Sequence, residues 1–483
     1  MTLSEPRQWH SDWLLTALAG VIAAALALLP LETMALVLFL GTAAIAAAVT
    51  PTAALVMMLI IAPLRTLMLT EAPGLLPLDI GQIGLGVAAA SWLAASIVRD
   101  RSIRLVWSPV YIPLTAFIAV TGLTAFSAWS LSAWLNEWLK WVQVGLVIMI
   151  CLSLAHDWQM LVFGLAIAGL ANAVIGILEY FGVSGALHLL INGTHFRAFG
   201  TFGQPNPFGG FMGLIAPIAL LTGIGYALRF RRQQRIDNVL PGLFYAAAGV
   251  IMAVALYMSF SRGAWLAFAI SAGAMVFALP RRAIYGAAVA AAGLLLIGGL
   301  WLSGRLPASI VERISSITQD TLSITDVRGV DVTPENYANV ERLAHWQAAV
   351  NMATASPWLG VGFGNYEVAY PEFRLMYWHF ALGHAHNYYL NVLAEAGMIG
   401  LLTYLALWVG VAIIIWQIRR HPDTLARCIG VGLLGSWTYL AIHSLTDNLY
   451  VNNIFLHLGT MIGIAAVLYR QSRNGTRWHA RLA

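Results

Sequence analysis

Two histidines and a group of arginines are the residues best suited to chemistry. His384, His386 and Asn387 lie in GHAHNYYL, residues 383–390, between a polar segment and an apolar run that continues to about residue 416. Ionisable groups at the start of a run long enough to cross a membrane are costly, so they are usually retained for function. A neutral imidazole can take a proton from a hydroxyl near neutral pH. We therefore expect His386 to act as a base, with His384 as a rival that residue types alone cannot exclude.

Arginines supply a complementary function. A guanidinium binds phosphate through a planar pair of hydrogen bonds and keeps its charge. Arg262 lies in a short turn between apolar runs, and Arg197 lies in the Gly- and Pro-rich segment 195–210, whose amides could bind an anion. The ordinary alternatives are a membrane-surface anchor for Arg262 and a plain loop around Arg197. We expect three further cations on the same side of the membrane as Arg197 and Arg262. They are weaker candidates for substrate binding: Arg342, Arg65 and Lys140.

A metal site is the main alternative for the histidines. His384, His386 and Glu395 could supply three ligands, but further ligands at the usual spacing are missing and the arginines would repel a cation. We expect neither a metal nor another cofactor. Asn387 could orient an imidazole, bind a sugar or cap the following helix.

The composition indicates a membrane protein of several spans. Of 483 residues, 60% are hydrophobic and 10% are charged, with a mean hydropathy of +0.77, whereas soluble proteins carry about 25% charged residues. The net charge of +5 comes mainly from short arginine clusters between apolar runs, so we expect no nucleic-acid partner. Cys151 and Cys428 lie inside apolar runs and resemble small core residues. The first apolar run, 13–29, lacks a cleavage site typical of a signal peptide.

The apolar runs predict an all-α bundle of about 12–14 spans. Their centres lie near residues 21, 41, 60, 89, 118, 146, 169, 218, 249, 271, 293, 403, 435 and 461. We expect a transmembrane bundle over 1–302, a large, partly helical outer loop over 303–385, and C-terminal spans with a tail over 386–483. Within the loop, a helix is expected from Pro334 to Ala355, because Pro favours the first helical position.

Basic residues predict the orientation of the bundle. Each arginine cluster follows an even-numbered span, so all clusters share one side, which we expect to be the cytoplasm together with both termini. The active site would then face the periplasm. The clusters are Arg99, Arg101 and Arg104; Arg229, Arg231, Arg232 and Arg235; Arg281 and Arg282; Arg419 and Arg420; and Arg470 and Arg473.

Several of these segments together resemble the O-antigen ligase and polymerase superfamily. His386 and Asn387 are followed after nine residues by GMIG, residues 397–400, which is similar to the signature of O-antigen ligases. The segments RLAHW (342–346) and PWLGVGFG (357–364) resemble the large-loop pattern of the superfamily. The segments FGTFGQPNP (199–207) and SRG (261–263) are similar to it as well, so the resemblance extends over about residues 190–450.

The resemblance implies a GT-C type glycosyltransferase of the bacterial inner membrane. Such enzymes take a glycan from undecaprenyl pyrophosphate by a metal-independent, inverting reaction. The acceptor is lipid A-core in ligases, a second lipid-linked unit in polymerases and a protein in related enzymes. The family's essential histidine maps onto His386, and its two essential arginines map onto Arg197 and Arg262.

Two other classes are alternatives. A lipid-glycan transporter would bind the same substrate without breaking a bond, but acidic residues within the spans are scarce and broken helices in paired repeats are absent. A structural membrane protein would not need so many outer arginines.

Overall fold

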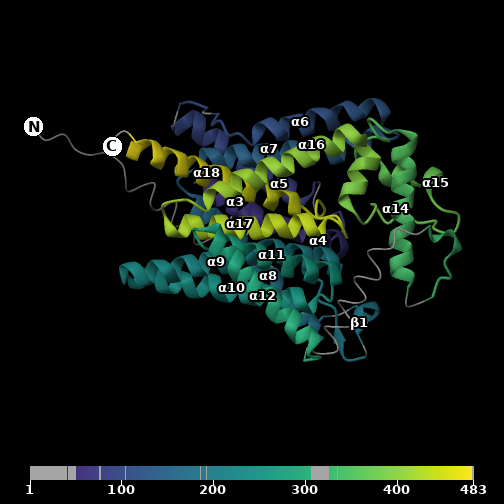
Figure 1. Cartoon of the computed structure of the whole chain (residues 1–483). Coiled ribbons are helices and arrows are strands. Elements are labelled where there is room, and N and C mark those ends of the chain that lie inside the picture. Colours follow the sequence, from purple (N-terminus) through teal and green to yellow (C-terminus); the bar gives the residue numbers. More distant parts are fainter. Residues whose placement is uncertain are drawn as a thin grey trace, which may run out of the picture.

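The chain forms a bundle of membrane-spanning helices with a helical loop at one end (Figure 1). The computed structural model describes residues 41 and 50–480, except 75–77, 100, 104, 185, 192, 306–325, 334 and 335. Ten helices in the described part are long and apolar enough to cross a membrane, and two shorter apolar helices accompany them. The fold is therefore an all-α, multi-pass membrane bundle.

The helices follow one another along the chain with short connections. The first half contains α3 (Pro51–Ile61), α4 (Arg65–Glu71), α5 (Ile80–Ala94), α6 (Tyr111–Leu123), α7 (Leu131–Ser153), α8 (Trp158–Tyr180) and α9 (Pro205–Gln233). The second half contains α10 (Val239–Met258), α11 (Arg262–Ala278), α12 (Ala283–Leu302), α14 (Tyr337–Ala355), α15 (Tyr366–Phe373), α16 (Tyr388–Ile418), α17 (Thr424–His443) and α18 (Ile454–Ala480). Two-residue strands, β1 (Leu190–Ile191) and β2 (His195–Phe196), pair antiparallel before α9.

The predicted spans agree with these helices. Ten of the expected centres fall in the ten long helices, including the one near residue 146. The centres near 118 and 271 fall in the shorter apolar helices Tyr111–Ser127 and Arg262–Ala278. The centres near 21 and 41, and the apolar run 13–29, lie in or reach into the part of the chain outside the described residues.

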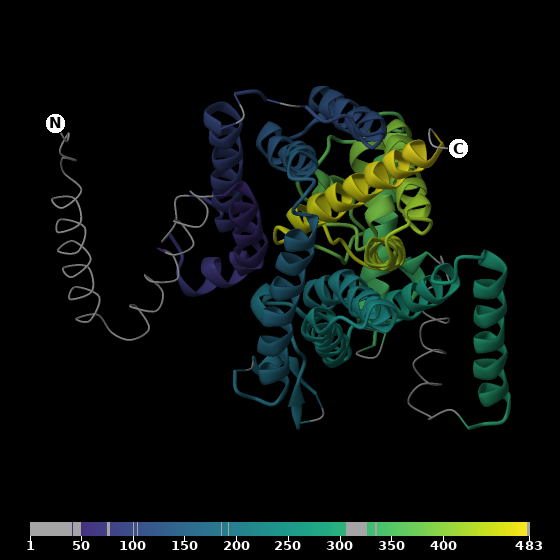
Figure 2. The ribbon, with the colours of Figure 1, turned by 90° about the vertical axis from the view of Figure 1, so that its left-hand side faces the viewer.

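Glycines let the central helices α9 and α17 pack closely. A Cβ on Gly213 of α9 would lie 2.2 Å from the ring of Tyr439 on α17, and one on Gly432 would lie 2.9 Å from the backbone of Ile218. Small residues allow this approach, and van der Waals packing then holds the helices together in lipid. By contrast, α12 stands at the edge of the bundle and is the least buried span (Figure 2).

The large loop carries α14 and α15, which project from one end of the bundle, while α18 ends at the opposite end (Figure 1). The helix predicted over 334–355 is present and ends at Ala355, as expected. It begins at Tyr337, and Pro334 and Glu335 lie outside the described residues. The loop therefore places a polar helix directly above the spans that carry the candidate histidines.

Candidate functional site at the loop end of the bundle

The two histidines lie in a tightly fixed turn before α16. The amide of His386 donates to Nδ1 of His384 at 3.0 Å, and the amide of Tyr388 donates to the carbonyl of Ser444 at 2.8 Å. Asn387 caps the helix, since its Oδ1 accepts from the amides of Tyr389 and Leu390 at 3.0 and 3.1 Å. Of the roles considered for Asn387, helix capping is thus the one that the geometry shows.

His386 adopts a backbone conformation that is unusual for a residue with a side chain. Its φ is +52°, in the left-handed region. Such a conformation costs roughly 1–3 kcal/mol and persists only where the surroundings impose it, often at functional sites. The turn therefore holds the His386 imidazole in a defined direction, toward Asp447 and the loop helix α14.

A buried carboxylate, Asp447, faces both histidines. Its Oδ1 lies 3.4 Å from Nε2 of His384 and 3.8 Å from Nδ1 of His386, and it also accepts from the amide of Asn448 at 2.8 Å. Burial alone would raise the pKa of Asp447, but the nearby imidazoles of His386, His384 and His443 bring it well below the usual range. Asp447 is therefore an anion that can orient an imidazole and stabilise its protonated form.

The rings of His384 and His386 differ in their hydrogen bonding. Because Nδ1 of His384 accepts a hydrogen bond from an amide, the neutral ring carries its proton on Nε2 and directs it at Asp447. Burial lowers the pKa of His384 to about 4, although Asp447 opposes this effect. Nδ1 of His386 is buried and makes no hydrogen bond within the described residues. Of the two rings, His384 is thus the more completely engaged by the protein.

His345 on α14 closes the cluster from the loop side. Its ring is fully buried, lies 5.6 Å from that of His386 between centroids, and stacks on Tyr370. The hydroxyl of Tyr366 donates to the His345 carbonyl at 3.0 Å and lies 3.0 Å from its Nδ1. Burial, with the nearby His386 and His384, lowers the pKa of His345 to about 4. The loop therefore contributes a neutral imidazole to the site.

Arg197 contacts the turn between α10 and α11, which leads into Arg262. Nε of Arg197 donates to the carbonyl of Ser259 at 3.0 Å, and its Nη2 lies 3.5 Å from Oδ1 of Asn206 and from the carbonyl of Phe260. Arg262 begins α11 two residues later. The Gly- and Pro-rich segment before α9 therefore brings the first arginine onto the turn that carries the second.

This arginine turn packs against the loop that carries Asp447. A Cβ on Gly263 would lie 2.4 Å from Oγ1 of Thr446, the neighbour of Asp447. Gly210 of α9 faces His443 at the end of α17, with a Cβ at that glycine 3.4 Å from its Nε2. Four segments distant in sequence thus meet at one end of the bundle: the start of α9, the α10–α11 turn, the end of α17 and the start of α16.

The remaining predicted cations have different partners. The charges of Arg342 and Lys140 both contribute to lowering the pKa of His384, so both lie near it. Lys140 pairs with Glu137 at 2.5 Å and also donates to the carbonyl of Tyr450 at 3.2 Å. Arg65 pairs with Asp79 at 2.5 Å. Neutralising partners make Lys140 and Arg65 weaker candidates for anion binding than the sequence suggested.

The motif glycine after the histidines has a direct structural reason. Gly397 interrupts α16 with φ +64° and ψ −167°, a combination essentially restricted to glycine. A Cβ there would lie 2.3 Å from the carbonyl of Trp358, and one on Gly360 would lie 2.3 Å from the backbone of Glu395. The amides of Val361 and Gly362 donate to this part of α16 at 3.0 Å each. The 357–364 segment is therefore locked onto the kink, which fixes the loop above the histidines.

His384, His386 and Asp447 also form a donor set that could hold a metal ion. Each offers one ligand atom, and the three atoms lie within 4.8 Å of one another. Glu395, considered earlier as a ligand, instead accepts from the amide of Tyr366 at 3.0 Å. The cationic surroundings argue against a metal, and its absence from the reaction stays a prediction.

Asp447, His443 and His345 were not predicted as site residues. The signal for Asp447 was present in the sequence, since an acid in a short loop between two apolar runs on the same side as His386 needs a partner. The burial of His345 and His443 depends on helix packing, which the sequence pattern does not report.

The fold and this cluster define a multi-pass membrane protein with a charged site at its loop end. Residues 247–405 match the family model described as O-antigen ligase, which confirms the resemblance to that superfamily over this part of the chain. No curated protein matches the chain. The matched region includes Arg262, Arg342 and the histidine turn, and it supports a glycosyltransferase of the O-antigen ligase or polymerase type. Arg197 and Asp447 lie outside it.

Proposed function

We propose that the protein is an O-antigen ligase that moves a glycan from undecaprenyl pyrophosphate to a hydroxyl of lipid A-core. We further propose that it works at the periplasmic face of the bacterial inner membrane, with both termini in the cytoplasm. The observation that carries the proposal is the buried carboxylate of Asp447 beside two imidazoles, packed against the turn that holds two arginines.

In the proposed reaction, the acceptor hydroxyl oxygen attacks the anomeric carbon of the donor sugar. The new glycosidic bond forms as the bond between that carbon and the pyrophosphate oxygen breaks, and undecaprenyl pyrophosphate leaves with the electron pair. His386 takes the hydroxyl proton, and Asp447 orients the ring and stabilises its charged form. Attack opposite the leaving group inverts the anomeric configuration and needs no metal.

Arg262 and Arg197 would bind the pyrophosphate. Negative charge grows on the leaving oxygen in the transition state, and fixed cations placed there stabilise it at little reorganisation cost. Arg342 on α14 is positioned as a further contact, since its charge acts on His384. The polar carbonyl contacts of Arg197 hold its guanidinium in place beside Phe260, whose own φ of +53° marks a constrained turn.

A groove beside the histidine turn would hold the sugars. A cavity of about 370 Å³ lies along α14, lined by Trp346, Gln347 and Asn351, and reaches Leu390 in the first turn of α16. An indole face with amide and charged groups at its rim is suited to a glycan, which stacks its C–H face on aromatics and hydrogen-bonds through its hydroxyls. An acceptor seated there would extend from the reacting hydroxyl at His386.

The product mass tests this proposal. Purified protein in lipid nanodiscs is given lipid-linked glycan with lipid A-core, or lipid-linked glycan alone. A ligase adds the glycan to lipid A-core, a polymerase lengthens the lipid-linked glycan, and both release undecaprenyl pyrophosphate without a gradient. A transporter forms no new glycosidic bond, and that result would overturn the proposed activity. Activity that survives EDTA supports the metal-independent reaction, whereas loss restored by a divalent ion would assign the His384–His386–Asp447 cluster to a metal.

A further inference from the structure

A second polar cavity lies at the end of the bundle opposite the histidine cluster. It has a volume of about 690 Å³ and is formed by the last turns of α5, the end of α7 and the far end of α18. The helix α18 starts beside the Asp447 loop, and Arg470 follows sixteen residues after Ile454. At 1.5 Å per residue this places the two sites roughly 24 Å apart along α18.

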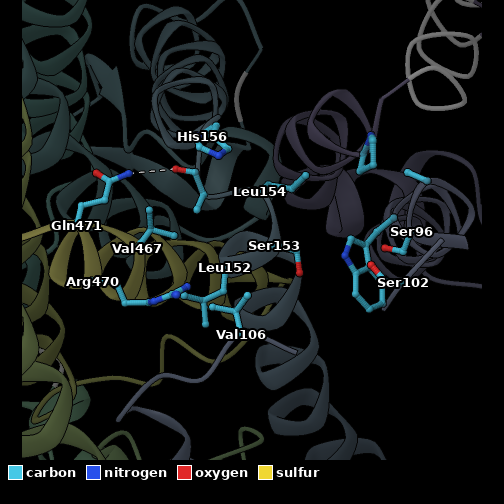
Figure 3. A pocket seen from close by; sticks show the side chains of 14 residues that line it. Ser96, Ser102, Val106, Leu152, Ser153, Leu154, His156, Val467, Arg470 and Gln471 are labelled. Carbon is cyan, nitrogen blue, oxygen red and sulfur yellow. Dashed lines mark hydrogen bonds between the residues drawn. The ribbon is translucent and has the colours of Figure 1, made fainter. Parts of the chain in front are cut away.

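The charged groups of this cavity are basic. Figure 3 shows Arg470, Gln471 and His156 on one side and Ser96 and Ser102 on the other. No carboxylate lines the cavity within the described residues. Arg470 is half-buried and makes no ion pair or hydrogen bond with any described residue. A partly buried guanidinium without a carboxylate partner favours an anion from outside the chain.

Within the described residues, the acid next to His156 in the sequence is already engaged. Asp157 follows His156, but its Oδ2 accepts from the hydroxyl of Thr52 at 2.5 Å. Gln471 is held in place by its donation to the carbonyl of Ala155 at 3.2 Å, which fixes the rim beside Arg470. The cavity is therefore a preformed basic pocket whose acid neighbour is directed elsewhere.

The other lining groups suit a headgroup at the membrane surface. Hydroxyls of Ser96, Ser102 and Ser153 face the cavity, and the indole of Trp92 forms part of its wall. Tryptophan concentrates at membrane–water interfaces, and basic pockets between spans bind the headgroups of anionic lipids. The pocket thus offers one cation, several hydroxyls and an apolar wall at one end of the bundle.

We propose that this cavity binds a phosphate-bearing ligand through Arg470, with the phosphate supplied by an anionic phospholipid headgroup or by a soluble phosphate. The site is separate from the glycan-transfer site, and its existence does not depend on that activity.

The test compares lipid retention by purified full-length protein. Wild-type protein and variants are placed in nanodiscs of phosphatidylcholine with phosphatidylglycerol, and native mass spectrometry counts the phosphatidylglycerol that stays bound. Arg470→Gln should lower retention about fivefold, because a basic residue near anionic lipid contributes about 1 kcal/mol. Ala95→Phe, which fills the cavity without removing charge, should lower it as well. Arg231→Gln, at an exposed arginine expected on the same membrane side at the end of α9, should not.

A second arm distinguishes the source of the phosphate. In detergent without anionic lipid, inorganic phosphate is added and the unfolding temperature is measured. Stabilisation that Arg470→Gln abolishes, without preferential retention of phosphatidylglycerol, supports a soluble ligand. Wild-type behaviour of both Arg470→Gln and Ala95→Phe in both arms would overturn the site. Equal losses of phosphatidylglycerol retention in Arg470→Gln and Arg231→Gln would also overturn the site, because they would show that retention depends only on the overall surface charge.

Discussion

The side chain of Asp447 explains how a single imidazole could be set up for proton transfer. Asp447 is buried among three histidines and remains ionised. Its interactions with their imidazoles outweigh the loss of hydration, which alone would raise its pKa. Of these rings, that of His443 is buried at 1% exposure, whereas the side chain of His386 is 21% exposed and its constrained φ fixes its direction. We therefore assign the base to His386 and a supporting role to His384.

Replacing Asp447 by Asn should separate positioning from folding. The amide keeps the shape but not the charge, so kcat for glycan transfer should fall about 10²-fold or more, while KM for the donor changes little. Asp447→Glu should restore part of kcat. Steady-state kinetics with purified protein, with the unfolding temperature as the folding control, provides the check. Unchanged kcat in Asp447→Asn would remove this residue from the mechanism.

The stability of the loop should depend on pH through His345. Its folded pKa of about 4 lies below the ordinary value of 6.5, so its contribution is fully present above pH 6.5 and is lost as the pH falls toward 4. The contribution is about 3 kcal/mol, and His384 adds to the loss over the same interval.

Unfolding temperatures measured from pH 7 to pH 4 provide the test. They should fall steadily for the wild-type protein and less steeply for His345→Asn, whose amide can replace the Nδ1 donor facing Tyr366. Asp447 contributes in a different range, because its folded pKa is below the ordinary one and its stabilisation is lost only under more acidic conditions. A flat wild-type profile down to pH 4.5 would contradict the buried, neutral state of His345.

At the scale of elements, the kink in α16 joins the loop to the bundle. Gly397 and Gly360 let the 357–364 segment lie against the helix with backbone-to-backbone contact. This contact holds α14, with Arg342 and His345, over the histidine turn. The spacing from His386 to Gly397 therefore sets how far along α16 the histidine turn lies from the 357–364 segment, which holds the loop helix α14 in place.

Gly397→Ala should destabilise this junction. Its conformation is restricted to glycine, and the added Cβ would lie 2.3 Å from the carbonyl of Trp358, so we expect a loss of about 2–4 kcal/mol and of activity. Gly298→Ala is the matched control, since a Cβ there meets nothing within 4 Å in the helix α12. Thermal unfolding in detergent compares the two, and equal unfolding temperatures would show that the kink does not support the loop.

The sequence predicted elements better than their meeting points. Apolar runs identify the spans because length and hydropathy are local properties, and the run near residue 146 is the long helix α7. The approach of Gly263 to Thr446, or of Arg197 to Ser259, depends on helix packing between distant segments. The partner of Arg65 was missed for the same reason, since Asp79 lies fourteen residues away in another segment, whereas Glu137 lies only three residues before Lys140 on the same helix.

At the scale of the whole molecule, the two polar sites lie at opposite ends of the bundle. The orientation proposed for the chain puts the histidine cluster in the periplasm and the Arg470 cavity in the cytoplasm. Both native cysteines, Cys151 and Cys428, are buried, so introduced cysteines can report the sides with little background.

Labelling should place Met376→Cys outside and Arg231→Cys inside. Both positions are exposed, the first in the segment between α15 and α16 and the second at the end of α9. A thiol reagent that cannot cross the inner membrane should modify Met376→Cys in spheroplasts, and Arg231→Cys only after lysis. The reverse pattern would put the active site in the cytoplasm and exclude a periplasmic reaction.

The most direct test of the central claim is a single-turnover experiment with His386→Ala. Purified wild-type protein and this variant are mixed with lipid-linked glycan and lipid A-core, and the glycosylated product and released undecaprenyl pyrophosphate are measured together by mass spectrometry. The variant should bind the donor, keep the wild-type unfolding temperature and form product at least about 10²-fold more slowly. Product formation at the wild-type rate would contradict the assignment of His386 as the base on which the proposed mechanism depends.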